Sequence, residues 1–244
     1  MVQLKVMHLE IIRFPFRTKT SQKRGKVYSI SLHFFFLFIK AKMEGEEEST
    51  IELTIATWNK QKMDWIAQAL KELPIDVQRL PQEFADIEET ENTFAGNAKL
   101  KVTALKESYP QSILLGEDSG LTIHGLNGFP GVKTARFAAG DDQLRARLLL
   151  QKLSGLPMSR RQASFNSAIA ISFPDGEETI CEGVLNGWIT DQENVETRAG
   201  YGSIFILSNG LSLAEYQQIQ PLDHRSQAMF QAKHVIKEWL NGRE

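Results

Sequence analysis

Strand-like and helix-like segments alternate early in this chain and a hairpin follows them, and this order most limits the possible folds. A short β-branched run at residues 53–57 precedes apolar residues at helical spacing over 63–73, and a second apolar stripe covers 94–105. Later, two strand-like runs flank a Pro-Asp-Gly turn at 174–176. This order predicts an α/β domain with a mixed β-sheet, whose ligands gather at the carboxyl ends of strands.

Composition agrees with one globular domain and narrows its surroundings. The chain has 244 residues, of which 42% are hydrophobic and 24% charged. Its single cysteine, Cys181, permits no internal disulfide or multi-thiolate metal site, and favours a reducing, cytoplasmic location. No stretch approaches the ~20 apolar residues of a membrane-spanning helix, so we expect no stable membrane association.

Charge is distributed unevenly along the chain. Of 28 Lys/Arg and 30 Asp/Glu residues, the first 42 positions hold nine basic residues and one acidic residue, which leaves 19 basic and 29 acidic residues beyond them. This excess of acidic residues disfavours binding to the phosphate backbone of a nucleic acid, and we expect no nucleic-acid partner. A small phosphorylated substrate remains possible, because a few cations and a metal ion can hold it.

We therefore divide the chain into an N-terminal extension, residues 1–50, and a domain at 51–244. Basic residues precede an apolar run at 27–39, which is the order found in targeting segments. Ser and His interrupt that run and no small-residue cleavage site follows it. The alternative is therefore a mis-assigned start, with Met43 as the true first residue, and we expect a disordered extension in either case.

The first segment suited to chemistry is a strand-to-helix turn. Backbone N–H groups and the positive end of the helix dipole make such a turn an anion site, while a capped helix with surface lysines is the alternative. The candidate phosphate-binding residues are Thr57, Trp58, Asn59, Lys60, Gln61 and Lys62.

Two acidic segments follow. Glu89 belongs to a charge run at 88–91, which alone would indicate a solvated loop. Glu117 and Asp118 directly follow an apolar strand at 113–115, where two carboxylates need a compensating cation or hydrogen bonds. A plain turn is the alternative there, because Asp-Ser-Gly also favours turns. Since Mg²⁺ prefers carboxylate oxygens, the two segments together favour a magnesium site.

His224 and Arg225 lie just before the last helix-like segment. A histidine in that place often caps or packs, but beside an arginine it can present hydrogen-bond donors to a ligand. Donors match the carbonyl oxygen at the six-position of hypoxanthine or xanthine, and do not match the amino group of adenine.

Taken in order, these segments resemble the inosine triphosphate pyrophosphatase family over roughly 53–240. The most specific stretch is Asp118-Ser119-Gly120-Leu121, followed by Leu-Asn-Gly-Phe-Pro-Gly-Val at 126–132 and Ala-Arg-Phe at 135–137. The resemblance implies an elongated mixed β-sheet flanked by helices, a central substrate cleft and a homodimer. Smaller matches in register are Thr57-x-Asn59-x-x-Lys62, Thr93-Phe94, Asn97-Ala98, Lys101, Glu182-Gly183, Gly187-Trp188-Ile189 and His224-Arg225.

The resemblance also implies residue roles. Residues 57–62 would bind phosphate, Glu89 and Asp118 would hold Mg²⁺, and Asp118 would also be the catalytic proton acceptor. Tyr201 would stack on the base, and His224 with Arg225 would recognise it. The implied substrate-binding residues beyond the phosphate turn are Ser119, Tyr201, Gly202, His224 and Arg225.

The implied activity is Mg²⁺-dependent hydrolysis of non-canonical purine nucleoside triphosphates, those of inosine, deoxyinosine and xanthosine, to the monophosphate and pyrophosphate. This chain departs from the family mainly at the base: a Tyr-Asp-Pro stretch is missing after Gly202, Ile219 replaces a lysine and Asp223 a serine. Two alternatives follow from these departures. The chain could be a catalytically weak nucleotide-binding protein of the same fold, or a pyrophosphatase for other modified nucleotides.

Overall fold

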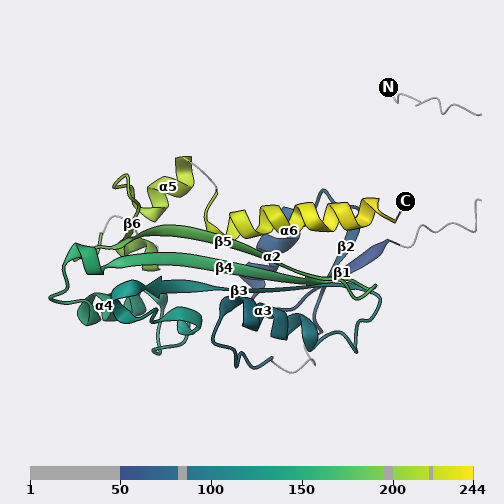
Figure 1. Cartoon of the computed structure of the whole chain (residues 1–244), viewed down its shortest axis with the longest axis horizontal. Coiled ribbons are helices and arrows are strands. Elements are labelled where there is room, and N and C mark those ends of the chain that lie inside the picture. Colours follow the sequence, from purple (N-terminus) through teal and green to yellow (C-terminus); the bar gives the residue numbers. More distant parts are fainter. Residues whose placement is uncertain (1–49, 82–86, 195–199, 220–221, 244) are drawn as a thin grey trace, which may run out of the picture. The chain divides into compact units, whose positions relative to one another are not determined.

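A computed structural model describes residues 50–81, 87–194, 200–219 and 222–243 (Figure 1). Residues Thr50–Glu244 belong to one compact unit. The predicted extension lies, apart from Thr50, outside the described residues. Within the described ranges, no helix has both the length and the apolar character needed to cross a bilayer.

A six-stranded mixed sheet in the order β2-β1-β3-β4-β5-β6 is the centre of this unit. β1 is parallel to β2 and β3, whereas the pairs β3–β4, β4–β5 and β5–β6 are antiparallel. The predicted α/β fold with a mixed sheet is therefore confirmed. The strands are β1 (Ile51–Ile55), β2 (Ile75–Arg79), β3 (Ile113–Ile123), β4 (Gln162–Ser172), β5 (Glu178–Ile189) and β6 (Phe205–Ile206).

Helices cover both faces of the sheet (Figure 1). On one face α2 (Lys60–Leu70) and α6 (His224–Asn241) pack against β1, β3, β4 and β5, and on the other lies α3 (Phe94–Thr103). Near β6 lie α4 (Asp142–Lys152) and α5 (Leu213–Ile219). Short 3-10 turns are η1 (His124–Leu126), η2 (Gly131–Lys133), η3 (Met158–Arg160) and η4 (Gly200–Ile204).

Polar side chains fix where the main helices begin. Asn59, Thr93, Asp141 and Asp223 precede α2, α3, α4 and α6, and each accepts a hydrogen bond from a backbone N–H of the first turn. Such caps contribute about 1 kcal/mol each and satisfy donors that have no partner within the helix. The predicted cap of the second helix, at Asn92 or Thr93, is Thr93.

The two ends of β3 lie in different apolar clusters. Ile113 and Leu115 pack with α2 and α6, whereas Leu121 and Ile123 pack with α4 and η4. Side chains on one face of a strand recur every second residue, so Glu117 and Ser119 share the face of these four residues and lie between the clusters. The carboxylate of Glu117 and the hydroxyl of Ser119 thus interrupt the otherwise apolar face of β3.

The prediction that a strand ends before Glu117 is wrong. β3 continues to Ile123 because β4 pairs with it from Leu114 to Ile123. On its other side, β1 pairs only as far as Leu115, since β1 ends at Ile55. From Gly116 onward, β3 therefore pairs with β4 on one edge and has no partner strand among the described residues on the other. Glu117 and Asp118 lie in this part of β3.

Candidate functional site

The site forms along the open edge of β3. Beyond Leu115 the edge is free of β1, and it is closed again at Leu121, whose N–H donates to Thr134 Oγ1 at 2.8 Å. Two cavities of about 480 and 310 Å³ lie along this edge. They adjoin one another along one cleft, since Asn59, Lys62, Ser119 and Ala135 line both.

The predicted phosphate turn lines this cleft. Asn59 Oδ1 accepts from the N–H of Lys62 at 3.1 Å, and the N–H of Asn59 donates to Thr57 Oγ1 at 3.2 Å. Lys60 is exposed and lines neither cavity, so the structure separates it from the other candidates. The remaining five candidates line one or both cavities: Thr57, Trp58, Asn59, Gln61 and Lys62.

Glu117 is a buried anion between two cations. Its carboxylate lies 2.6 Å from Lys62 Nζ and 3.7 Å from Arg225 Nε, and it accepts from Ser167 Oγ at 3.2 Å. Burial alone would raise the pKa of Glu117, but Lys62 and Arg225 outweigh it and lower that pKa to about 2. Glu117 is therefore ionised at neutral pH and holds both cations at the cleft.

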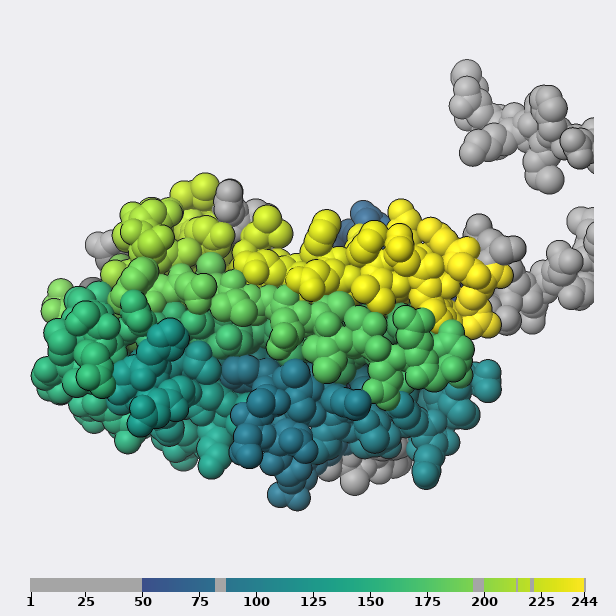
Figure 2. Space-filling model, viewed as in Figure 1, coloured from purple at the N-terminus to yellow at the C-terminus, as the bar shows by residue number. Residues whose placement is uncertain are grey.

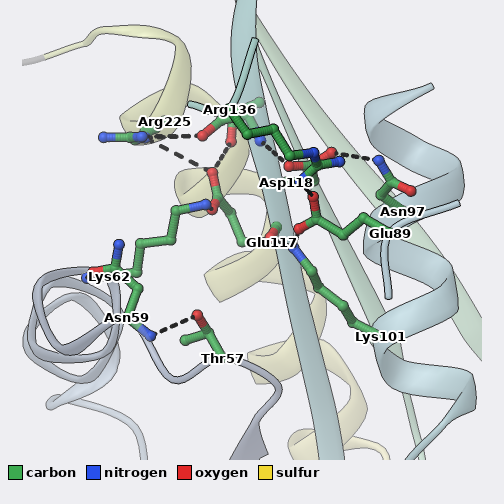
Figure 3. A network of polar contacts seen from close by, with 12 residues as sticks. Thr57, Asn59, Lys62, Glu89, Asn97, Lys101, Glu117, Asp118, Arg136 and Arg225 are labelled. Carbon is green, nitrogen blue, oxygen red and sulfur yellow. Dashed lines mark hydrogen bonds and ion pairs between the residues drawn. The ribbon is translucent and has the colours of Figure 1, made fainter. Parts of the chain in front are cut away.

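Asp118 points to the opposite face of the sheet, where α3 lies (Figure 3). Asn97 Nδ2 donates to Asp118 Oδ2 and the N–H of Ser119 donates to Oδ1, each at 3.0 Å. Burial raises the pKa of Asp118, and the opposing effects of Lys101 and Asn97 are smaller. Strand alternation thus separates the two neighbouring carboxylates, and each finds its own partners.

Glu89 reaches the cavity of Asp118 although 29 positions separate them in the sequence. Its carboxylate contacts Lys101 Nζ at 2.5 Å and forms a second ion pair with Arg136 (Figure 3). Burial raises the pKa of Glu89, but Lys101 and Arg136 together lower it below its usual value. Lys101 Nζ also donates to the backbone oxygen of Glu117 at 2.8 Å, which ties α3 to β3.

This donor set suits Mg²⁺. Magnesium is commonly held by one or two carboxylates while waters and substrate phosphates supply the other oxygens. Glu89 and Asp118 supply two carboxylates in one cavity beside Lys62. In the part of the chain that the structure describes, no group of three or more His, Cys, Asp or Glu side chains is arranged around a common point. A site of two carboxylates completed by phosphate oxygens is therefore what these residues fit.

The larger cavity ends in an aromatic pocket. His224 is 6% exposed and stacks on Phe165 with ring centroids 5.1 Å apart. Burial, assisted by the neighbouring Arg225, lowers the pKa of His224 to about 4, so the imidazole is neutral at pH 7. Its Nδ1 is buried without a hydrogen-bond partner. Arg225 Nη2 donates to Ser119 Oγ at 3.0 Å, which places both predicted base-contacting residues at the cleft.

Tyr201 and Gly202 line the same cavity from η4. Tyr201 is buried, and its hydroxyl donates to the backbone oxygen of Thr134 at 2.5 Å. Burial raises the pKa of Tyr201 to about 12, so the hydroxyl keeps its proton. Gln217 of α5 and Arg225 of α6, helices that are yellow-green and yellow in Figure 2, also line this cavity.

A model of the Ham1 family matches residues 53–235. The chain belongs to the Ham1 family. A Halalkalibacterium halodurans protein named a non-canonical purine NTP pyrophosphatase homolog is 44% identical over 189 residues, which cover 78% of this chain and 97% of that protein. A Bacillus cereus protein named dITP/XTP pyrophosphatase is 32% identical and covers 80% of this chain and 99% of its own length. The predicted resemblance is thereby confirmed.

Solved structures of the Ham1 family agree. A HAM1 protein from Coxiella burnetii has a TM-score of 0.66 at 32% identity and covers 78% of this chain and all of its own. A Staphylococcus aureus Ham1 protein has a TM-score of 0.65 at 30% identity, covering 79% of this chain and all of its own.

Two glycines of the motifs shared with the Ham1 family position this site. A Cβ on Gly120 would lie 2.5 Å from Thr134 Oγ1 and 2.8 Å from the oxygen of Gly131, so only glycine lets that loop close the edge of β3. A Cβ on Gly183 would lie 1.9 Å from the oxygen of His224. The absence of a side chain there allows the first turn of α6 to approach β5 and to carry His224 into the cleft.

Several residues at the site were absent from the predicted set. The buried Asn97 and Lys101 share one face of α3, and polar residues on the apolar stripe of a helix were the signal that could have identified them. Arg136 lay within a matched Ham1 motif, but its sequence position did not show that it would reach Glu89. Phe165 had no signal beyond the alternation of its strand. Ile219, which replaces an expected lysine, is 67% exposed and lines neither cavity.

Proposed function

We propose that this chain is a Mg²⁺-dependent pyrophosphatase for non-canonical purine nucleoside triphosphates. Its substrates are the triphosphates of inosine, deoxyinosine and xanthosine, and its products are the monophosphate and pyrophosphate. One observation carries the proposal. At one end of a single cleft lie the N-terminus of α2, which is suited to phosphate, and the carboxylates of Glu89 and Asp118. At the other end lies the neutral His224 beside Arg225. The names of the two relatives, a non-canonical purine NTP pyrophosphatase homolog and a dITP/XTP pyrophosphatase, support the same substrate class.

At the phosphate end the residues have distinct tasks. Water attacks the α-phosphorus, the bond from that phosphorus to the bridging oxygen breaks, and pyrophosphate leaves with that oxygen. The start of α2 and Lys62 bind the phosphate groups and offset their negative charge. Asp118 accepts the proton of the attacking water, which its raised pKa favours. Mg²⁺ held by Glu89 and Asp118 supplies further charge compensation when bound.

At the base end the residues supply donors and an apolar surface. A neutral imidazole has one N–H, and a guanidinium has only donors. Together His224 and Arg225 match the six-carbonyl of hypoxanthine or xanthine and leave the amino group of adenine facing donors. Phe165 and Tyr201 offer aromatic surface for the purine ring, since offset stacking stabilises ring pairs by about 1 kcal/mol.

We further propose the setting of this activity. The domain at 51–244 acts in the cytoplasm as a homodimer, without a nucleic-acid partner and without stable membrane association. The lone cysteine and the acidic charge of this part of the chain support the location and the absence of a nucleic-acid partner.

Pyrophosphate release across a panel of triphosphates tests the proposed activity. Purified protein with Mg²⁺ should hydrolyse inosine, deoxyinosine and xanthosine triphosphates at least ~10-fold faster than ATP, which is the discrimination expected from one mismatched donor pair. Omission of Mg²⁺ with a chelator present should stop turnover. Tight binding of inosine triphosphate without release would indicate the nucleotide-binding alternative. Preferred hydrolysis of a modified pyrimidine triphosphate would indicate the other alternative, a pyrophosphatase for other modified nucleotides.

A further inference from the structure

The loop from Gly131 to Gly140 touches both ends of the cleft. Ala135 lines both cavities, and the next residue, Arg136, forms the ion pair with Glu89 at the phosphate end. The side chain of Arg136 is 47% exposed, so its position depends on Glu89 and on where the loop backbone places it.

Three contacts fix that backbone. Thr134 Oγ1 donates to the oxygen of Gly131 at 2.6 Å and accepts from the N–H of Leu121. Arg145 of α4 donates to the oxygens of Ala138 and Gly140 at 3.1 and 2.5 Å. The third contact comes from the Tyr201 hydroxyl, which donates to the oxygen of Thr134, two residues before Arg136.

Tyr201 and Thr134 both line the cavity proposed for the base, and of the groups that make these three contacts Tyr201 presents an aromatic ring there. Tyr201 is 6% exposed, and its hydroxyl lies where solvent does not replace a lost partner. The ring of Tyr201 is the surface among these groups on which a bound purine can stack.

We propose that Tyr201 is a positioning residue that couples occupancy of the base cavity to the placement of Arg136 at the phosphate end. This inference rests on the proposed function. A purine against the Tyr201 ring restricts the ring, so the hydroxyl keeps its hydrogen bond to the Thr134 carbonyl and the loop keeps Arg136 beside Glu89. A correct base thereby increases turnover in addition to binding.

Tyr201→Phe tests the coupling because it keeps the ring and removes only the hydroxyl. It should lower kcat for inosine triphosphate about tenfold and change KM less than about twofold, as expected when one buried carbonyl loses its donor but the stacking surface remains. Tyr216→Phe is the matched control. Tyr216 packs against the same apolar cluster and lines neither cavity, so its kcat should stay within about twofold of wild type.

A double-mutant cycle with Arg136→Ala identifies the path. If Tyr201 acts through Arg136, adding Tyr201→Phe to Arg136→Ala should slow turnover by less than about twofold. In urea unfolding of the metal-free, ligand-free variants, the losses in free energy of unfolding from the two substitutions should likewise be non-additive. Multiplicative effects on kcat with additive effects on unfolding, or a Tyr201→Phe effect on KM alone, would overturn the coupling. Absence of turnover by the wild type would instead overturn the proposed function, and the unfolding cycle would still decide the coupling.

Discussion

Glu117 and Asp118 are neighbours on one strand, and both are carboxylates buried to at least 95%, yet their surroundings on the two faces of β3 differ. Glu117 faces two cations, which lower its pKa to about 2. Asp118 accepts a hydrogen bond from the amide of Asn97, and burial raises its pKa more than Lys101 and Asn97 lower it. Pairs of titratable groups with pKa values displaced in opposite directions commonly have different roles in one site. The comparison supports the proposal that Glu117 holds the cations in place and that Asp118 accepts a proton.

Replacing Asp118, the proposed proton acceptor, should give the largest of the effects that test this comparison. Asp118→Asn should lower kcat for inosine triphosphate about 10²–10⁴-fold, the usual contribution of a general base. The asparagine oxygen can still accept from Asn97, so the thermal melt of the metal-free protein should change little. A variant that keeps wild-type turnover would show that Asp118 is not the proton acceptor.

Glu117→Gln should instead affect stability. The displacement of the Glu117 pKa from 4.5 to about 2 corresponds to about 3 kcal/mol at neutral pH, similar to the cost of breaking a buried ion pair. Urea unfolding of metal-free protein at pH 7 measures this loss. Asp64→Asn is the control: its ion pair with Arg79 is more than half exposed and should contribute less than about 1 kcal/mol.

The pH dependence of that loss has a definite sign. Because the folded pKa of Glu117 lies below the unfolded one, its stabilisation is complete above about pH 4.5 and disappears as pH falls towards about 2. Wild type and Glu117→Gln should therefore approach one another in stability below pH 4.5. A difference that stays constant from pH 7 to pH 3 would contradict an ionised, cation-paired Glu117.

The sequence was sufficient to predict those features that depend on local pattern. Helix spacing, caps and strand alternation predicted α2, α3, the β4–β5 hairpin and the mixed sheet, and motif order predicted the resemblance to the inosine triphosphate pyrophosphatase family. The convergence of Glu89 and Asp118 was predicted from the chemistry of carboxylates and from the resemblance. Their roles remain predictions, although both side chains line one cavity.

The sequence was insufficient to predict features that depend on strand pairing and on contacts between residues distant in the sequence. The strand through Asp118 was predicted to end too early because polar residues at 117–119 resemble a turn, whereas continuous pairing with β4 extends β3. The opposite faces of Glu117 and Asp118 follow only once that strand is known. Lys101 and Arg136 were missed as partners of Glu89 for the same reason, since 12 and 47 positions separate them from it.

His224 extends the comparison to a group that burial keeps neutral, and it gives the smallest of these effects. Its folded pKa of about 4 lies below the unfolded 6.5, so the unfolded chain binds a proton that the folded chain does not. The free energy of unfolding should therefore fall by about 2 kcal/mol between pH 7 and pH 5 through this residue alone. His224→Gln cannot titrate and should show a flatter curve over that interval, although it will be less stable at pH 7. Glu117 responds only below pH 4.5, so the two windows separate, and parallel wild-type and His224→Gln curves from pH 7 to pH 5 would show that the imidazole is not held neutral by burial.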